Sequence, residues 1–169
     1  MVNTRLARPS ASILCKKALR KYTLAMNIVI ANDHGAVDLK LRLLEWLKSQ
    51  GHLVTNLGVD TEERVDYPDM AELAIDEYRR GGYDLGILLC GTGIGISMAA
   101  NRHKGIRCAL VHNAFTALMA KEHNDANFLA LGGRVDYAQP PEEIVATFLS
   151  ATFEGGRHEQ RVAKLDTLT

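Results

Sequence analysis

Residues 86–97 read Gly86-Ile87-Leu88-Leu89-Cys90-Gly91-Thr92-Gly93-Ile94-Gly95-Ile96-Ser97, and this segment decides the fold. The apolar run from Asp84 to Leu89 predicts a short buried strand. Three alternate glycines then predict a turn, and residues 96–101 predict a helix. The first backbone N–H groups of such a helix point outward at the positive end of its dipole. The segment therefore favours an anion, either a phosphate or an oxyanion formed during a reaction.

The spacing of the glycines narrows the kind of anion. Gly91-x-Gly93-x-Gly95 fits neither the dinucleotide fingerprint Gly-x-Gly-x-x-Gly nor a Walker A loop, which needs a lysine after its glycines. Cys90 stands at the mouth of the turn, where a thiol near the N-terminus of a helix can act as a nucleophile or a base. The alternative is a tight structural turn with a buried cysteine.

The rest of the chain alternates short apolar runs with helical patterns. Strands are predicted at residues 27–31, 52–57, 84–89, 106–111 and 127–131. Helical patterns separate them, and two more helices are expected at residues 140–151 and after Gly155-Gly156. This alternation predicts an α/β fold, a doubly wound, Rossmann-like three-layer sandwich with a five-stranded parallel sheet. The first and third strands should flank the switch point where ligands bind.

The 169 residues carry no net charge, but the charge is unevenly distributed. Residues 1–25 contain six basic residues and no acid, so residues 26–169 carry 14 basic against 20 acidic residues. This acidic body argues against a nucleic acid partner, and no apolar run reaches the ~20 residues of a membrane span. Three cysteines without paired metal-ligand spacing predict neither a disulfide framework nor a metal site. We expect a cytoplasmic protein.

The composition also divides the chain. Residues 1–25 form a basic leader that is expected to be either a disordered tail or, with Met26 as the true start, a segment that is not native. Such a basic, acid-free segment is also compatible with organellar targeting, so that alternative stays open. Residues 26–169 should form one domain.

Polar residues follow the predicted strands at the ends where open parallel sheets bind ligands. They are Asp33 and His34 after the first strand, Cys90-Gly91-Thr92 after the third, and Gly132-Gly133-Arg134 after the fifth. Arg157 and Arg161 are four residues apart, so on one helix they share a face where a phosphate suits their guanidinium groups. The alternative is a pair of solvated surface arginines. His123 lies at the end of a predicted helix. It is either an acid/base group or a cap of that helix.

These residues resemble the B-type ribose-5-phosphate isomerases, in the family shared with galactose- and allose-6-phosphate isomerases. The resemblance covers residues 26 to about 168. Its motifs are Asp33-His34-Gly35, Asp66-Tyr67-Pro68, residues 90–97, His123-Asn124-Asp125-Ala126-Asn127, Gly132-Gly133-Arg134 and Glu154-Gly155-Gly156-Arg157-His158-Glu159-Gln160-Arg161. It implies that residues 26–169 interconvert ribose 5-phosphate and ribulose 5-phosphate in the pentose phosphate pathway, without a metal or an organic cofactor.

The resemblance also implies residue roles. Cys90 would be the base that moves a proton between C2 and C1 through an enediolate, and His123 would open the sugar ring. The implied substrate-binding residues are Asp33, His34, Tyr67, Gly91, Thr92, Gly93, Ile94, Gly95, Asn124, Arg134, Arg157 and Arg161. A homodimer whose sites are shared between subunits is also implied. Two alternatives remain, an allose- or galactose-6-phosphate isomerase and a non-enzymatic sugar-phosphate sensor.

Overall fold

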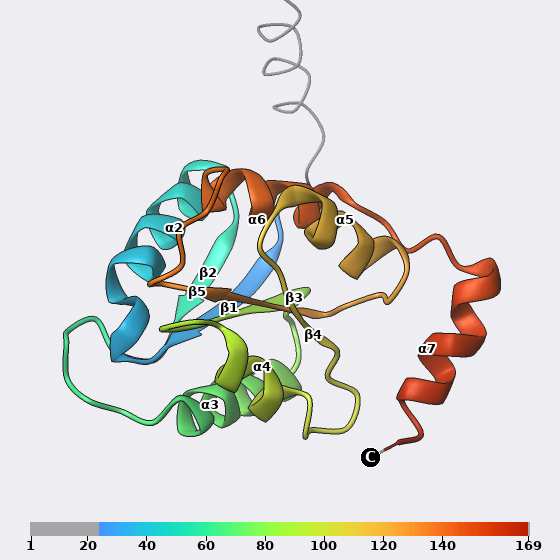
Figure 1. Cartoon of the computed structure of the whole chain (residues 1–169), viewed down its shortest axis with the longest axis horizontal. Helices are drawn as coiled ribbons and strands as arrows, with labels where there is room; N and C mark the ends of the chain where they lie inside the picture. The colour runs from blue at the N-terminus through green and yellow to red at the C-terminus, as the bar shows by residue number, and fades with distance from the viewer. Residues whose placement is uncertain (1–23, 169) are drawn as a thin grey trace, which may run out of the picture.

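Five short segments form a parallel sheet in the computed structural model, which describes residues 24–168. The strands are β1 (Asn27–Asn32), β2 (Leu53–Asn56), β3 (Leu85–Cys90), β4 (Cys108–Leu110) and β5 (Phe128–Gly132). Their order across the sheet is β2-β1-β3-β5-β4, and every neighbouring pair is parallel. The predicted fold class is confirmed (Figure 1). The predicted leader lies almost entirely outside the described residues.

The central strand β3 is buried along its whole length because both faces of the sheet are covered. Ile87 and Leu89 pack into one apolar core, whereas Leu88 and Cys90 pack into the core on the other face. Gly86 has a structural reason to lack a side chain. A methyl group there would lie 2.1 Å from the ring of Phe128 on the neighbouring β5.

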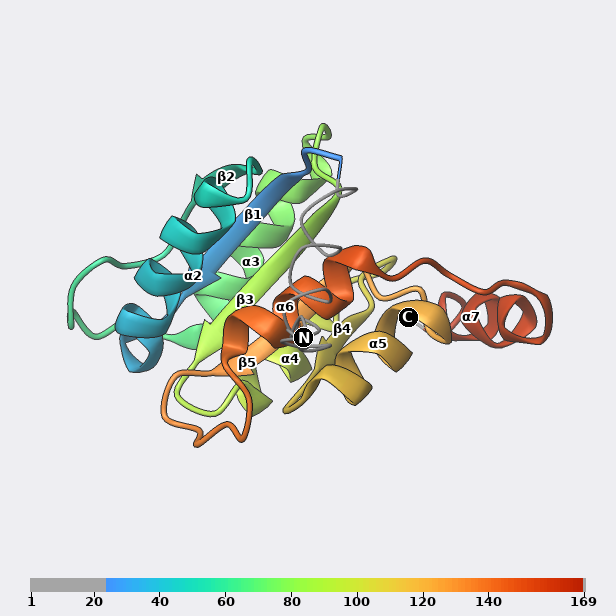
Figure 2. The same ribbon diagram turned by 90° about the horizontal axis from the view of Figure 1, so that it is seen from above.

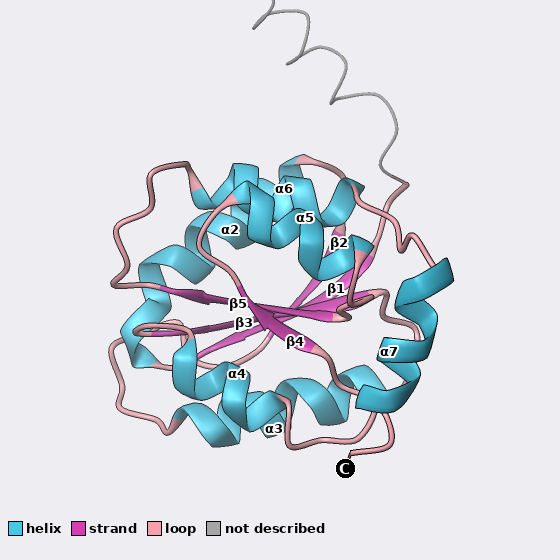
Figure 3. Cartoon of the chain, turned by 45° about the vertical axis from the view of Figure 1, so that its right-hand side comes forward, coloured by secondary structure: helices cyan, strands magenta, loops and turns pink. Residues whose placement is uncertain are grey.

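Two layers of helices cover the sheet (Figure 3). One face carries α2 (Val37–Ser49), α5 (Ala114–Glu122) and α6 (Pro141–Ser150), and the other carries α3 (Tyr67–Arg79) and α4 (Ile94–Ala100). Two 3₁₀ turns, η1 (His34–Ala36) and η2 (Gly156–His158), precede α2 and α7 (Glu159–Leu165). Helix α7 lies apart from both layers, at one extreme of the molecule (Figure 2). None of the helices within residues 24–168 has the length and apolar character needed to cross a membrane.

Helix α7 is joined to the body through Arg107, just before β4. The guanidinium of Arg107 makes two hydrogen bonds to the Asp166 carboxylate, at 3.0 and 3.1 Å, and an ion pair with Asp125. It also donates to the backbone carbonyl oxygens of Asn124 and Asp125. Arg107 therefore couples the end of α7 to the loop that follows α5.

Candidate functional site

Three loops that follow β1, β3 and β5 meet at the carboxyl edge of the sheet. Asp33 N–H donates to the Leu89 carbonyl at 3.1 Å, Gly133 N–H donates to the Cys90 carbonyl at 2.8 Å, and Arg134 N–H donates to the Gly91 carbonyl at 2.9 Å. From the adjacent strands β1 and β3 the chain turns to opposite sides of the sheet. This edge is therefore the predicted switch point, and it brings together the site residues expected after three of the strands.

The floor of this edge is built from backbone segments that approach closely. A methyl group on Gly35 would lie 2.9 Å from the Gly91 nitrogen, and one on Gly133 would lie 2.5 Å from the Cα of Ala36. A methyl group on Gly95 would lie 2.7 Å from the ring of Tyr67, the first residue of α3. The two backbone contacts explain why glycine stands at positions 35 and 133, whereas Gly95, the second residue of α4, meets only the end of the Tyr67 side chain.

Cys90 is the last residue of β3, and only 4% of it is exposed. Its sulfur accepts a hydrogen bond from Gly93 N–H at 3.1 Å. Gly93 can point its N–H back at the sulfur because it adopts a φ of 77°, which side-chain-bearing residues rarely adopt. The loop therefore fixes the sulfur at the carboxyl end of β3, beside the start of α4.

Asp33 and His34, at the end of β1, are held by contacts with the backbone. The Asp33 carboxylate accepts from Gly35 N–H at 2.7 Å and thereby caps η1. His34 Nδ1 lies 3.2 Å from the Val65 carbonyl oxygen, just before α3. Thr92 Oγ1 accepts from Ile94 N–H at 3.3 Å at the start of α4. A cavity of about 450 Å³ adjoins this edge, and its lining includes His34, Gly35, Gly133, Arg134 and residues 60–62.

A buried lysine holds the loop on the rim of this cavity. The side chain of Lys40 is 0% exposed, and its Nζ donates to the Leu57 and Val59 carbonyl oxygens at 3.1 and 2.7 Å. The same Nζ lies 2.6 Å from an oxygen of Asp60. The Lys40 hydrogen bond, together with one from Asn56, lowers the pKa of Asp60. Lys40 thus ties helix α2 to the loop between β2 and α3, a contact that the sequence pattern did not reveal.

The remaining predicted residues lie at the opposite edge of the sheet. His123 and Asn124 follow α5 and precede β5, while Arg157 and Arg161 belong to η2 and α7. Gly86 pairs with Phe128 and Cys90 pairs with Gly132, so four residues, roughly 13 Å of strand, separate the two edges. Figure 2 shows α7 and the loop between β2 and α3 at opposite extremes of the molecule. One chain therefore does not bring Cys90 and His123 together.

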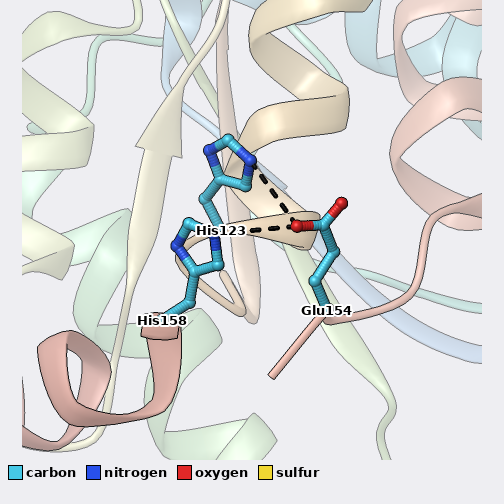
Figure 4. A group of neighbouring side chains, drawn as sticks. All are labelled: His123, Glu154 and His158. Carbon is cyan, nitrogen blue, oxygen red and sulfur yellow. Dashed lines mark ion pairs between the residues drawn. The ribbon is translucent and has the colours of Figure 1, made fainter. Parts of the chain in front are cut away.

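At the amino edge His123 forms a cluster with two residues to which the sequence analysis gave no role. The rings of His123 and His158 stack with centroids 4.2 Å apart and planes at 9° (Figure 4). Glu154 Oε2 lies 3.9 Å from His123 Nε2 and 3.6 Å from His158 Nε2. Burial lowers the pKa of His158, and the charges of His123 and Arg157 add to the shift. In the sequence, the position of His158 between Arg157 and Arg161 was the one feature that could have indicated its place in the site.

The expectation of one helix carrying both arginines is wrong in detail. Arg157 lies in the 3₁₀ turn η2 and Arg161 in α7, so they do not occupy successive turns of one regular helix. The cause is the pair Gly155 and Gly156, whose φ values of 66° and 57° make the chain enter a tight turn before α7 begins. This turn places the Arg157 Nε 3.3 Å from His158 Nε2, to which it donates.

Comparisons with known proteins show which proteins this chain is similar to. The family model described as "Ribose/Galactose Isomerase" matches residues 28–165. A ribose 5-phosphate isomerase structure from Thermotoga maritima aligns with a TM-score of 0.81 and 46% identity, over 85% of this chain and 99% of that one. A "Probable ribose-5-phosphate isomerase B" of Mycoplasma genitalium is 43% identical, over 84% of this chain and 95% of its own. The "Galactose-6-phosphate isomerase subunit LacB" of Clostridium acetobutylicum is 42% identical, over 82% and 80%.

Proposed function

Because the chain belongs to the ribose/galactose isomerase family, we propose that it interconverts ribose 5-phosphate and ribulose 5-phosphate through an enediolate. The observation that carries the proposal is the carboxyl edge, where Cys90, the glycine loop, His34 and Arg134 converge beside a cavity. Moving a hydrogen between adjacent carbons requires one base that reaches both carbons and donors placed where negative charge develops. The predicted residues supply both requirements.

In this mechanism Cys90 removes the proton from C2 and returns it to C1. Backbone N–H groups of residues 91–95, other than those of Gly93 and Ile94, which donate within the loop, hold the enediolate oxygens together with Asn124. One such donor typically contributes about 3–4 kcal/mol to transition-state stabilisation. Asp33 and Tyr67 bind the sugar hydroxyl groups as polar neighbours. No metal or organic cofactor takes part in the proposed steps.

His123 opens the furanose ring, and the cations hold the phosphate. His34 and Arg134 approach the phosphate from the carboxyl edge, whereas Arg157 and Arg161 belong to the amino edge. Guanidinium groups suit this task because their planar fork matches phosphate oxygens. A five-carbon phosphate is too short to contact both edges of one chain, which lie roughly 13 Å apart along the strands.

We therefore place each active site between two subunits of a homodimer. The carboxyl edge of one chain would supply Cys90, His34 and Arg134, and the amino edge of its partner would supply His123, Asn124 and the two arginines. Exposed apolar side chains on α4 and α5 suit such an interface, with Met98 64% and Phe115 69% exposed. A closed two-fold dimer would then contain two equivalent sites.

A coupled assay for ribulose 5-phosphate formation tests the function directly. We expect turnover of ribose 5-phosphate without any added metal or cofactor. Well-folded dimeric protein that binds ribose 5-phosphate but does not turn over any sugar phosphate would support the sensor instead. Light scattering of the purified chain tests the dimer independently of activity, because a monomer would leave Cys90 and His123 at separate edges.

The similarity to a galactose-6-phosphate isomerase subunit supports one alternative substrate class, the six-carbon phosphates. We favour ribose 5-phosphate because this chain carries the base, the histidine and the arginines together. The comparison of kcat/KM for ribose 5-phosphate and allose 6-phosphate decides between them. A higher kcat/KM for allose 6-phosphate would show that the proposed substrate is wrong, although the type of reaction would stay the same.

A further inference from the structure

The buried ring of His158 covers one face of the His123 imidazole. The two rings are nearly parallel, with planes at 9° and centroids 4.2 Å apart (Figure 4). The side chain of His158 is 4% exposed, whereas that of His123 is 35% exposed. A side chain enclosed by protein therefore supports one face of His123, and the rest of the His123 ring is accessible to a ligand.

This stacking contact restricts the orientation of the His123 ring. The carboxylate oxygen of Glu154 lies 3.9 Å from His123 Nε2, which is too far for a hydrogen bond. The backbone N–H of His123 donates to the Met119 carbonyl oxygen at 3.0 Å, but that bond leaves the side-chain torsions free. A flat ring against one face opposes tilting, because a tilted His123 ring would collide with His158.

His158 can serve as a support because its own segment is attached to the end of α5. Glu154 N–H donates to the carbonyl oxygen of Glu122, the residue directly before His123, at 3.0 Å. Arg157 Nε donates to His158 Nε2 at 3.3 Å and holds the edge of that ring. The His158 ring is therefore placed relative to the same helix end that carries His123.

We propose that His158 is a positioning residue that holds the His123 imidazole in the orientation needed to open the sugar ring. Ring opening moves a proton from the anomeric hydroxyl and delivers one to the ring oxygen, while the bond between C1 and that oxygen breaks. Each transfer needs the nitrogen within hydrogen-bond reach of the oxygen. This role rests on the proposed function, because ring opening is the step assigned there to His123.

The charge state of His158 suits a supporting role. Burial lowers the pKa of His158 from its ordinary value, and the charges of His123 and Arg157 lower it further. The His158 ring is therefore neutral at pH 7. A neutral ring adds no charge repulsion when His123 takes up a proton, whereas a second imidazolium 4.2 Å away would oppose that protonation.

Two variants separate support from proton transfer. His158→Asn removes the ring, and kcat on ribose 5-phosphate should fall by up to about 100-fold, the cost of misplacing a reacting group by roughly 1 Å. KM should hardly change. Solvent exchange at C1 of ribulose 5-phosphate, which has no furanose ring to open, should stay close to that of the wild type. His158→Phe restores a flat ring without a nitrogen and should recover most of the lost turnover.

Three results of these assays would overturn the proposal. Unchanged turnover by His158→Asn is the first. The second is a parallel loss of turnover and exchange, which would indicate a role in folding or in phosphate binding. The third is a His158→Phe variant as impaired as His158→Asn, which would show that His158 itself transfers protons. His112→Asn, which removes an exposed histidine outside the cluster, is the matched control and should behave like the wild type.

A double variant tests whether His158 acts through His123. His123→Asn combined with His158→Asn should lose no more turnover than His123→Asn alone, because the support then has no imidazole to position. Losses that multiply in the double variant would contradict the proposal.

NMR of the full chain without substrate tests the support independently of activity. The ring current of His158 should shift the His123 ring protons upfield, and the shift should disappear in His158→Asn and persist in His158→Phe. His123 ring signals that are the same in the wild type and His158→Asn would overturn the support. A shift that behaves as expected in a protein without isomerase activity would contradict the proposed function and not the support.

Discussion

At the residue scale the proposed mechanism gives Cys90 and His123 different steps, and substitutions can separate them. Cys90→Ala should abolish isomerisation and also solvent exchange at C1 of ribulose 5-phosphate, because the glycine loop offers no other base. His123→Asn should lose most activity on ribose 5-phosphate, which is mainly cyclic. It should keep exchange on ribulose 5-phosphate, which cannot close a furanose ring through its phosphorylated O5. NMR of the C1 protons in D₂O measures this exchange.

Both outcomes of that experiment bear on the roles. Equal loss of exchange in the two variants would remove ring opening from His123, and exchange retained by Cys90→Ala would remove the base role from Cys90. Cys90→Ala should remain folded, because it removes one small side chain at the end of β3.

A second residue-scale prediction concerns pH and His52. His52 Nδ1 accepts from Met26 N–H at 3.2 Å, and burial lowers the pKa of this histidine. The unfolded chain therefore binds a proton more readily than the folded chain once the pH falls below about 6.5. The contribution of His52 to the free energy of unfolding should be fully present above that pH, and it should decline as the pH falls toward 5. The Tm of His52→Gln should fall less over this range, although it starts lower at pH 7.

Thermal unfolding between pH 5 and pH 7 measures this difference. The lower starting Tm reflects a lost hydrogen bond worth about 0.5–1.5 kcal/mol. His112→Gln serves as the control, because that exposed histidine should leave the wild-type slope unchanged. Parallel curves for the wild type and His52→Gln would show that other groups set the acid sensitivity.

At the element scale Lys40 links α2 to the loop between β2 and α3. Lys40→Met should lower the unfolding free energy by about 1–3 kcal/mol for each carbonyl that stays unsatisfied, because Leu57 and Val59 lose their donor. It should also raise KM, because residues 60–62 border the cavity beside His34. Denaturant unfolding and steady-state kinetics measure the two effects. Lys48→Met, at an exposed position of the same helix, should change stability by less than about 0.5 kcal/mol.

The sheet was predictable from the sequence because each strand is a short apolar run between polar loops. The order of β1 and β3 at the switch point was also expected and is confirmed, as is the family indicated by the six motifs. The contacts of Lys40 and the stacking of His123 on His158 were not predictable. They depend on how distant loops pack, and no local periodicity encodes that packing. The pair Gly155-Gly156 before η2 could be read from the sequence, but the positive φ values that these glycines adopt could not.

At the scale of the whole molecule the two edges of one sheet serve two different sites in the proposed dimer. A mixture of Cys90→Ala and His123→Asn chains should therefore regain activity on ribose 5-phosphate. Each hybrid dimer would combine an intact carboxyl edge with an intact amino edge in one of its two sites. Random pairing of equal amounts makes half of the dimers hybrid, so about a quarter of wild-type activity should return.

Co-expression of the two variants followed by the coupled assay tests this expectation. A mixture of Cys90→Ala with itself in differently tagged forms is the control and should remain inactive. Absence of recovery in verified hybrid dimers would show that each site is built within one chain, against the proposed arrangement.

The close backbone contacts beneath the site have a consequence for how this protein can diverge. Gly35 and Gly133 have no room for a side chain because backbone atoms of neighbouring loops lie against them, so mutation cannot reshape the floor without moving whole loops. Thr61 and Glu62 border the cavity as exposed residues of the loop between β2 and α3, and there replacements meet fewer constraints. We expect lineages that adopt longer or shorter sugars to accumulate their changes along this rim, while the glycine floor is inherited unaltered.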